Sequence, residues 1–249
     1  MTSSTGYDAA LFDEVAQLEA QSFWFRARNR LIVSTLLRHF PGVQSILEVG
    51  CGTGYVLTAL RAAFPEARLV GSELLPEGLE YARRRVPDVE LVTLDILDSS
   101  YSEEFDVVGA FDVLEHIEDD DGALRGIHRA ARAGGGAVLL VPQHPRLWSR
   151  TDELAHHARR YRRRELVRKL EAAGFRVVAV SSFVTTLLPV LAFARAFDRV
   201  RPPTTPFRGL TPSYVNGVFE RALDAERRLI ERGVSLPAGG SLLVVARKG

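Results

Sequence analysis

The sequence predicts an α/β protein in which helices cover both faces of a mostly parallel, doubly wound sheet. Strand-like apolar runs alternate with helix-like segments over residues 46–183, and this alternation is typical of parallel sheets. The first run, 46–49, carries three apolar residues in four positions, as expected of a strand that is buried on both faces. With 249 residues, 46% of them hydrophobic, the chain is large enough for one such domain with an insertion.

The order of the predicted elements divides the chain into three parts. Apolar residues at helical spacing predict an N-terminal helical cap over residues 1–43. The core is expected to occupy residues 44–183 and 237–249, and residues 184–236 are expected to form an insertion between its last two strands. Strands are predicted at 46–49, 68–73, 89–94, 105–111, 137–141, 175–183 and 241–247.

Helices are predicted between these strands from apolar periodicity and from end signals such as Pro76, Gly174 and the acidic start at Asp119. A glycine-rich turn is expected at 133–136, and a polar connection is expected at 143–161. The core helices are predicted at 54–64, 76–85, 119–132 and 163–173, and those of the insertion at 185–199 and 215–232.

An aromatic trio followed by alternating arginines lies in the predicted cap, at residues 23–30. One interpretation is a lid over a ligand, in which Trp24 stacks on a substrate and Arg28 binds an anion. The alternative is an aromatic anchor that packs the N-terminal helices onto the sheet, because aromatic side chains are usually packed.

The first strand leads into a glycine loop, Glu48-Val49-Gly50-Cys51-Gly52-Thr53-Gly54. Glycines let a ligand approach the main chain closely, and the amide groups at the start of the next helix would point at that ligand. The spacing is Gly-x-Gly-x-Gly and differs from the Gly-x-Gly-x-x-Gly of dinucleotide-binding loops. A carboxylate beside the loop, Glu48, would repel a phosphate and suits a ligand that carries an ammonium or a sulfonium group.

This segment resembles motif I of the class I S-adenosylmethionine-dependent methyltransferases, and the chain is similar to their small-molecule, type 11/12-like branch. The resemblance covers residues 46 to about 182 and the final strand. It implies a Rossmann-like, seven-stranded sheet with an antiparallel last strand, and S-adenosyl-L-methionine as the cofactor, with S-adenosyl-L-homocysteine as the product. The loop residues expected to contact the cofactor are Glu48, Gly50, Cys51, Gly52, Thr53 and Gly54.

Two acids follow the second and third predicted strands, on the edge of the sheet where parallel strands end. Glu73 lies 19 residues after Gly54, where a carboxylate can accept both ribose hydroxyls of a nucleoside. Leu74 is expected to line the adenine. Asp95 is expected to accept the adenine amino group while Ile96 packs on the ring, with Asp98 as the alternative to Asp95.

The end of the fourth strand, from Phe111 to Ile117, resembles the motif IV region of small-molecule methyltransferases. Phe111, Asp112 and Val113 are then expected to border the methionine part of the cofactor and the methyl acceptor. Glu115 and His116 are the predicted reactive pair. One interpretation makes His116 a general base, because an unperturbed imidazole titrates near neutrality. The alternative is that the pair orients this loop.

The segment 143–161 resembles a segment of one bacterial methyltransferase branch, where it lies over the active site. His157 is therefore a candidate for catalysis, and His144, Arg160 and Tyr161 are candidates for substrate contact. No metal site is expected, because the histidines lack the helical spacing of zinc ligands and no second cysteine exists. A net charge of +1 gives no reason to expect a nucleic-acid partner. The basic run at 159–164 is interpreted as a solvated helix start, and the alternative is phosphate or RNA binding.

A single cysteine, Cys51, excludes an intramolecular disulfide, and a catalytic thiol is disfavoured because no cationic partner is evident. No signal peptide is recognisable at the start of the sequence, and the longest apolar stretch, 183–197, is too short to span a membrane. A cytoplasmic protein is therefore expected.

The resemblance to the class I methyltransferases implies an enzyme that transfers a methyl group by in-line displacement to an oxygen, nitrogen or carbon of a small acceptor. The apolar insertion predicts a partly hydrophobic acceptor, such as a natural-product or lipid-like intermediate. The same insertion is a candidate contact for a membrane surface or for a second copy of the chain in a homodimer. The alternative functions are a non-catalytic sensor of S-adenosylmethionine and an NAD-dependent oxidoreductase, which the glycine spacing and Asp95 disfavour.

Overall fold

The predicted α/β sheet is present in the computed structural model, which describes residues 11–205 and 213–249. Residues 1–10 of the predicted cap and 206–212 of the predicted insertion lie outside the described residues. The strands are β1 (Ser45–Val49), β2 (Arg68–Glu73), β3 (Glu90–Thr93), β4 (Phe105–Phe111), β5 (Ala131–Pro142), β6 (Phe175–Phe183) and β7 (Ser241–Lys248).

The strands form one seven-stranded sheet in the order β3-β2-β1-β4-β5-β7-β6. The pairs from β3 to β5 are parallel, whereas β7 is antiparallel to both β5 and β6. The chain moves outward from β1 to β3 and then returns to place β4 beside β1. In parallel sheets, ligands bind at the carboxyl ends of the strands next to such a reversal, so the ends of β1 and β4 mark the candidate site.

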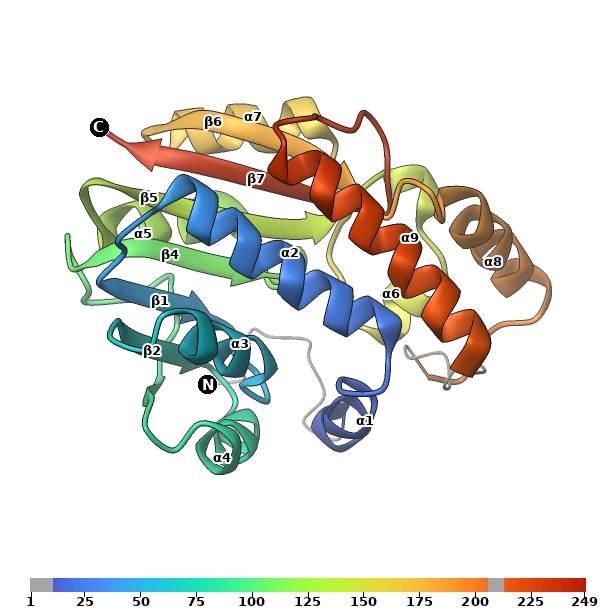
Figure 1. Cartoon of the computed structure of the whole chain (residues 1–249), viewed down its shortest axis with the longest axis horizontal. Coiled ribbons are helices and arrows are strands. Elements are labelled where there is room, and N and C mark those ends of the chain that lie inside the picture. The colour runs from blue at the N-terminus through green and yellow to red at the C-terminus, as the bar shows by residue number, and fades with distance from the viewer. Residues whose placement is uncertain (1–10, 206–212) are drawn as a thin grey trace.

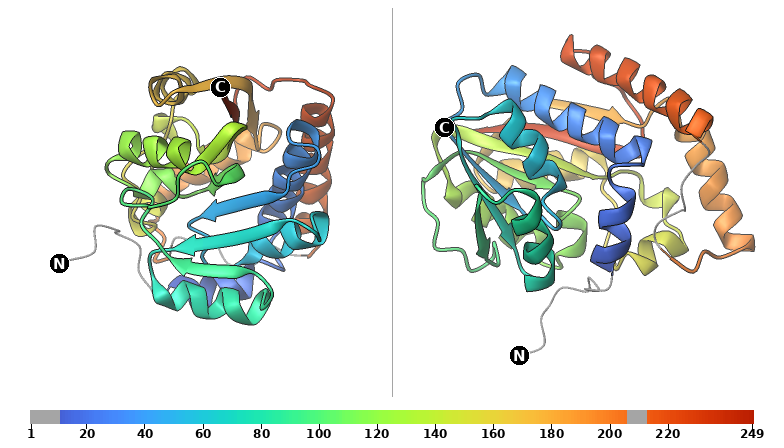
Figure 2. Two further views of the ribbon diagram at one scale, coloured as in Figure 1. Left: turned by 90° about the vertical axis from the view of Figure 1, so that its left-hand side faces the viewer. Right: turned by 60° about the horizontal axis from the view of Figure 1, so that its bottom comes forward.

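Helices cover the two faces of the sheet, as Figures 1 and 2 show. The long helix of the predicted cap and the helix before β7 share one face with the two helices that follow β1 and β2: α2 (Phe23–His39), α9 (Ser213–Glu231), α3 (Tyr55–Ala63) and α4 (Pro76–Arg85). The opposite face is covered by α5 (Asp120–Ala130) and α7 (Arg163–Ala172). The remaining helical elements lie near the carboxyl ends of the strands (Figure 1): α1 (Leu11–Leu18), η1 (Leu114–His116), η2 (Pro145–Leu147), α6 (Arg150–Leu154) and α8 (Leu188–Val200).

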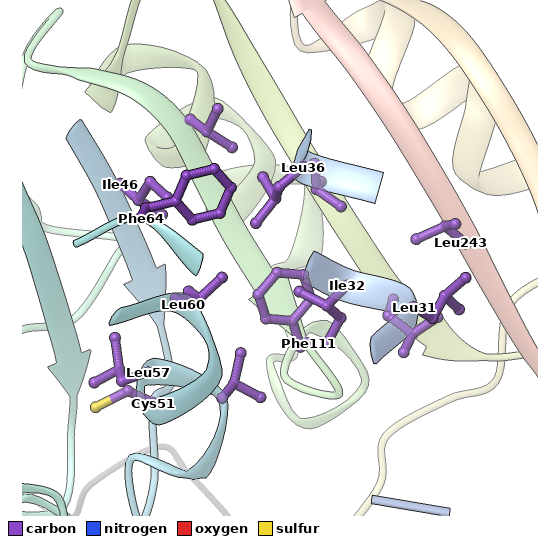
Figure 3. Close-up of a cluster of buried hydrophobic side chains, with 14 of the residues drawn as sticks. Leu31, Ile32, Leu36, Ile46, Cys51, Leu57, Leu60, Phe64, Phe111 and Leu243 are labelled. Atoms are coloured by element: carbon purple, nitrogen blue, oxygen red, sulfur yellow. The ribbon is translucent and has the colours of Figure 1, made fainter. Parts of the chain in front are cut away.

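The core beneath α2 connects the cap to the sheet. Figure 3 shows side chains of α2 beside side chains of α3, β4 and β7, and all of them belong to one buried cluster. Burial of each large aliphatic side chain contributes about 1.5–3 kcal/mol, so α2 is held mainly by apolar packing. The labelled members include Leu31, Ile32, Leu36, Leu57, Leu60, Phe111 and Leu243.

Helix α9 of the insertion lies alongside α2 of the cap (Figure 1). The rings of Phe23 and Phe219 meet edge to face with centroids 5.3 Å apart. Arg26 and Arg30 both pair with Glu220. Segments that are far apart in the sequence therefore form one layer. The division of the chain into cap, core and insertion stays a prediction.

The predicted turn at 133–136 is wrong, because these residues lie inside β5. Ala131 pairs with Phe105, and the next paired residues are Gly136 and Val107. The residues between them form a bulge with extra residues on the β5 side, and Gly134 adopts φ +75° there. The glycines therefore bend a strand that continues on both sides of them.

The helices of the insertion leave apolar side chains in solvent. Phe193 of α8 is 74% exposed and Val200 is 83% exposed, whereas Leu187 at the start of this segment belongs to the core. Across residues 11–205 and 213–249, every helix is too short or too polar to cross a membrane.

Candidate active site

The glycine loop joins β1 to α3 at the carboxyl edge of the sheet. Gly50 adopts φ +65°, and a Cβ there would lie 2.5 Å from the side chain of Val113. Gly54 adopts φ +75°, and a Cβ there would lie 3.0 Å from Ala82 of α4. Gly50 and Gly54 are therefore needed for two reasons. Their positive φ values favour glycine, and Val113 and helix α4 leave too little room for a Cβ atom.

Glu48, the acid before the loop, is buried at 3% exposure within β1. Burial raises its pKa to about 8, with the positive charge of Arg28 acting in the opposite direction. Its Oε2 atom has no hydrogen-bond partner in the described structure. A buried carboxylate of this kind favours a cationic ligand, and the contact of Glu48 to an ammonium group stays a prediction.

Glu73 at the end of β2 folds back onto the glycine loop. Its Oε2 accepts a hydrogen bond of 3.1 Å from the amide of Gly52, and its Oε1 accepts bonds of 2.7 and 3.1 Å from the amides of Leu74 and Leu75. Burial raises the pKa of this carboxyl group, and the three amides oppose that shift. The structure thus brings Glu73 onto the glycine loop, and the nucleoside contacts of Glu73 and Leu74 stay a prediction.

The segment before α2 covers the loop from the other side. Glu19, which is 5% exposed, accepts hydrogen bonds from the hydroxyl of Thr53 at 2.6 Å and from Arg85 Nη1 at 2.6 Å. The ring of Phe12 lies 3.7 Å from a Cβ built at Gly52. Sequence analysis missed Glu19, because it precedes Thr53 by 34 residues and carries no motif.

The thiol of Cys51 is buried. Burial raises its pKa well above the usual range, and the charges of Glu48 and Glu73 add to this. The thiol is therefore neutral at physiological pH, which disfavours the alternative of a catalytic thiolate.

Asp95 and Ile96 follow β3 at the same edge. Asp95 Oδ1 accepts a hydrogen bond of 2.9 Å from the amide of Leu97, and this closes the turn after the strand. Ile96 is 2% exposed and packs in the core beneath α5, against the backbone of Gly126. The adenine contact of this pair stays a prediction.

The end of β4 meets α2 through an ion pair. Arg28 Nε lies 2.6 Å from Asp112 Oδ2, and Arg28 Nη2 donates a hydrogen bond of 2.6 Å to the carbonyl of Phe111. The guanidinium carbon lies 5.3 Å from the ring centroid of Trp24. Asp112 adopts φ +57°, a conformation that costs energy outside glycine. The structure thus brings the predicted substrate residues Trp24 and Arg28 to the predicted cofactor residues at the end of β4.

Glu115, His116 and His157 form a cluster just beyond this point. Glu115 and His116 belong to η1, which follows β4 directly, whereas His157 comes from the segment after α6. The two imidazole rings have centroids 4.8 Å apart and stand at 82°. Burial, followed by the charge of Asp112, raises the pKa of Glu115 well above its ordinary value. Burial, followed by the neighbouring His157, lowers the pKa of His116 to about 3.

The low pKa of His116 bears on the two interpretations of this residue. An imidazole with a pKa of about 3 stays neutral near pH 7 and is a weak proton acceptor. The orienting interpretation, in which the neutral ring shapes the loop, therefore fits the structure better than the general-base interpretation.

Asp152 of α6 fixes the ring of His157. This carboxylate is fully buried and accepts hydrogen bonds from His157 Nδ1 at 3.0 Å and from Arg160 Nε at 2.7 Å. Burial alone would raise its pKa, but the bond from His157 and the charge of Arg160 lower it to about 2. Sequence analysis missed Asp152 as a site residue. The signal was the capping box Ser149-x-x-Asp152 at the start of α6.

The remaining predicted substrate residues support the segment that carries His157. Tyr161 is fully buried, and its hydroxyl donates toward the carbonyl of Leu114 at 3.1 Å and toward Asp120 at 2.9 Å. Arg160 Nη1 donates to the carbonyl of Gln143 at 3.0 Å. His144 is half-buried, and its amide donates to the carbonyl of Tyr161 at 3.0 Å. This geometry does not favour direct substrate contact by Tyr161.

Among curated proteins, the chain is similar to two sugar N,N-dimethyltransferases. It is 32% identical over 136 residues to the dTDP-4-amino-2,3,4,6-tetradeoxy-D-glucose N,N-dimethyltransferase of Saccharopolyspora spinosa, covering 52% of this chain and 54% of that protein. It is 35% identical over 114 residues to the dTDP-3-amino-3,6-dideoxy-alpha-D-glucopyranose N,N-dimethyltransferase of Streptomyces fradiae, covering 45% and 43%. The chain thus spans about half the length of these relatives.

Two solved structures share the fold at low identity. A methyltransferase of Thermotoga maritima, described as a possible histamine N-methyltransferase, has a TM-score of 0.63 and 16% identity and covers 97% of each chain. The geranyl diphosphate C-methyltransferase of Streptomyces coelicolor, solved with Mg²⁺, geranyl diphosphate and S-adenosyl-L-homocysteine, has a TM-score of 0.61 and 15% identity and covers 88% of this chain and 79% of that chain. At these identities the likeness shows the fold alone, and it confirms the predicted Rossmann-like class.

The methyltransferase domain family matches residues 17–180, about two thirds of the chain. That span includes the glycine loop, Glu73, Asp112 and the cluster of Glu115, His116 and His157. The chain therefore belongs to the methyltransferase domain family, and its fold is that of the class I, Rossmann-like domains.

Proposed function

We propose that the chain transfers a methyl group from S-adenosyl-L-methionine to an oxygen, nitrogen or carbon atom of a small, partly hydrophobic molecule. The observation that carries the proposal is the position of two groups of residues at one edge of the sheet. The glycine loop with Glu48 and Glu73 lies beside β1 and β2, and the Glu115, His116 and His157 cluster follows β4, which is the neighbour of β1.

In this proposal the cofactor lies along the first group. Glu73 binds the ribose hydroxyls in place of one or more of its present amide partners, and Glu48 faces the ammonium group of the methionine part. Asp95 and Ile96 contact the adenine, and Asp112 borders the methyl group. Support comes from the buried, raised-pKa carboxyl group of Glu48 and from the contact of Glu73 with the loop amide of Gly52.

The acceptor then lies between the methyl group and the cluster. Its nucleophilic atom attacks the methyl carbon in line with the sulfur, the carbon–sulfur bond breaks, and S-adenosyl-L-homocysteine leaves as a neutral thioether. A proton lost from an oxygen or nitrogen acceptor passes to the cluster, where Asp152 holds the ring of His157 through its Nδ1 atom. Positioning supplies much of the rate acceleration, because the sulfonium is already a good leaving group.

The insertion lies against the segment that bears the cluster, so its side chains are in reach of an acceptor bound there. Helix α8 docks onto the segment that bears the cluster, because Arg195 Nη1 donates a hydrogen bond of 2.8 Å to Ser149 Oγ and Thr151 donates one of 3.2 Å to Asp198. The names of the two sugar dimethyltransferases and of the geranyl diphosphate enzyme suggest which acceptors to try first. Contact of the insertion with a membrane or a second copy stays a prediction, for which exposed Phe193 and Val200 are candidates.

The first test is calorimetric titration of the protein with S-adenosyl-L-homocysteine and with NADH. We expect binding of S-adenosyl-L-homocysteine alone, and strong loss of that binding in Glu73→Ala. Glu80→Ala is the matched control, because Glu80 is an exposed residue on the nearby helix α4. Tight NADH binding without S-adenosyl-L-homocysteine binding would make the loop a dinucleotide site and contradict the proposal.

Turnover is tested separately from cofactor binding. The protein is incubated with S-adenosyl-L-methionine and a panel that contains a dTDP-amino sugar, a prenyl diphosphate and a demethylmenaquinone, and formation of S-adenosyl-L-homocysteine is measured. We expect acceptor-dependent turnover with a partly hydrophobic member of the panel. Cofactor binding without turnover across a broader acceptor library would favour the alternative of a non-catalytic S-adenosylmethionine sensor.

A further inference from the structure

We propose that Glu115, His116 and His157 bind a divalent transition-metal ion at the acceptor side of the methyl-transfer site. The binding part of this inference needs only the geometry of the cluster. The role given to the ion, orienting and activating the acceptor, rests on the proposed function.

The three side chains already approach the spacing of metal ligands. One ligand atom from each of them lies within 4.8 Å of the other two. Metal–ligand bonds of about 2.1 Å at tetrahedral angles place ligand atoms about 3.4 Å apart. The longest of these separations therefore needs to shorten by up to about 1.4 Å, which side-chain rotations can supply.

The burial of Glu115 without hydrogen-bond partners is the strongest single indication that a cation binds here. The residue is 1% exposed, and neither of its carboxylate oxygens has a hydrogen-bond partner in the described structure. A buried carboxyl group without partners is costly, and buried charges in proteins are paired or coordinate metals. Arg28 and Arg160 act on Glu115 through their charge, but each is engaged elsewhere, Arg28 with Asp112 and Arg160 with Asp152.

Each imidazole ring makes a hydrogen bond through one of its nitrogens, as metal-binding histidines usually do with the nitrogen that does not bind the ion. His157 Nδ1 lies 3.0 Å from the buried carboxylate of Asp152. The ring of His116 makes a hydrogen bond to the backbone of His156. A carboxylate or carbonyl on one ring nitrogen fixes the tautomer and makes the opposite nitrogen the coordinating atom.

Asp152 is itself fixed by further contacts, so the orientation of His157 is not left to a mobile side chain. The carboxylate accepts the amide of Ser149 at 3.0 Å and Arg160 Nε at 2.7 Å. Arg195 of α8 lies 3.8 Å from it. The insertion thus takes part in the support of the cluster.

The donor set selects the class of metal. Two imidazoles and one carboxylate suit zinc, iron, cobalt or nickel, whereas magnesium prefers oxygen ligands alone. Three protein ligands leave positions open for an acceptor oxygen or nitrogen. A metal-bound hydroxyl or amine loses its proton at lower pH. The freed lone pair then forms the bond to the methyl carbon while the carbon–sulfur bond breaks. Because the ring nitrogens of the cluster are engaged when the ion is bound, the proton then goes to solvent, and transfer to the cluster applies only to the metal-free site.

The experiment uses the full chain without an affinity tag, stripped with a chelator and dialysed. Cobalt(II) is titrated while the visible absorption bands of the bound ion are recorded, and zinc(II) binding is measured by calorimetry. We expect one saturable site per chain, and weak or no binding of magnesium.

Three variants test the proposed ligands and the carboxylate that orients His157, and a fourth serves as the control. Glu115→Gln and His157→Gln are expected to remove the cobalt bands. Asp152→Asn is expected to weaken zinc binding about 10- to 100-fold, as the loss of a partner behind a ligand typically does. His128→Gln is the matched control, because this half-buried histidine packs on Phe175 on the opposite face of the sheet from the cap, and it should leave the site unchanged.

Binding of S-adenosyl-L-homocysteine is measured on each variant and separates the two proposals. Variants that keep it are folded, so their loss of cobalt binding is attributable to the ligands. Absence of a saturable metal site in a wild type that binds S-adenosyl-L-homocysteine overturns the metal proposal and leaves the proposed function standing. A site that persists unchanged in both Glu115→Gln and His157→Gln also overturns it. Metal binding without cofactor binding would overturn the proposed function alone.

Discussion

Arg28 and Asp112 form an ion pair of 2.6 Å that joins the middle of α2 to the end of β4. The guanidinium is 8% exposed and the carboxylate is 23% exposed, so the pair is largely withdrawn from water. Asp112 adopts a left-handed conformation, with φ +57°, at the point where it meets Arg28. The helix that covers the candidate site is therefore tied electrostatically to a residue that we place beside the methyl group.

Removal of the cation from this pair should destabilise the protein. Arg28→Met leaves Asp112 without its partner in a poorly solvated place, and we expect a loss of about 2–4 kcal/mol in the free energy of unfolding. Urea unfolding measures it. The control is Arg30→Met on the same helix, whose guanidinium is 38% exposed, and its loss should stay below about 1 kcal/mol. Equal losses in the two variants would contradict a special role for the Arg28–Asp112 pair.

Binding of S-adenosyl-L-homocysteine should depend on pH through Glu48. Burial raises the pKa of this carboxyl group to about 8, so the ligand-free protein holds the proton at pH 7, whereas an ammonium ligand requires the ionised form. We therefore expect affinity to rise from pH 6 to pH 8 and a proton to be released on binding at pH 7. Calorimetry in buffers of different ionisation enthalpy measures this release, and Glu48→Gln should abolish it.

The same residue gives a stability test in the absence of ligand. The folded pKa of about 8 exceeds the unfolded value, so the contribution of Glu48 to stability is complete below about pH 4.5 and is lost as pH rises through about 8. Glu48→Gln should gain relative to the wild type as the pH rises across this range. A constant difference between the two proteins would contradict the raised pKa.

The cover over the glycine loop should slow release of the cofactor. Glu19 binds both Thr53 and Arg85, so Glu19→Ala is expected to speed dissociation of S-adenosyl-L-homocysteine about tenfold, equivalent to about 1.4 kcal/mol. Stopped-flow displacement measures the rate. Gln17→Ala is the control, because Gln17 is exposed on α1 and should leave the rate unchanged. Unaltered release from Glu19→Ala would mean that this contact does not close the site.

Substitution of two glycines with nearly equal φ values separates the cost of a strained backbone from the cost of a steric clash. Gly42 has φ +76° with nothing within 4 Å of a built Cβ, whereas Gly54 has φ +75° with Ala82 at 3.0 Å. Gly42→Ala should cost about 1–2 kcal/mol for the left-handed backbone alone. Gly54→Ala should cost about 1–3 kcal/mol more, because α4 must move. Thermal or urea unfolding of both variants checks the difference.

The sequence predicted the parts of the fold that local signals determine. Pro76 begins α4 where it was predicted, and the sixth strand has the predicted bounds 175–183, because proline, glycine and apolar runs act within a few residues. The glycines of 133–136 gave the wrong prediction, because a glycine run permits a turn and a bulge equally. Pairing with β4 on one side and β7 on the other decides between them.

The site residues also divide into those that local sequence signals predict and those that depend on tertiary contact. The loop glycines, Glu73 and the Glu115–His116 pair follow strand ends and could be predicted from that position. Glu19 acts on Thr53, which lies 34 residues further along the chain, so only tertiary contact reveals it. Asp152 acts on the nearby His157, and its capping box with Ser149 was a sequence signal for the start of α6 and not for this contact. Tyr161 shows the reverse, since a residue chosen for substrate contact proves to be fully buried.

Strand β7 lies between β5 and β6, although it follows both in the chain. On the ribosome, all residues proposed here to bind the cofactor or the metal emerge before residues 241–248 are made. Until then β5 presents an unpaired edge and β6 lacks its only neighbour in the sheet. The nascent domain therefore passes through a stage at which the half that bears the site can assemble while an apolar strand edge is still unpaired. During this stage, binding to a chaperone or pairing with another nascent chain competes with completion of the sheet.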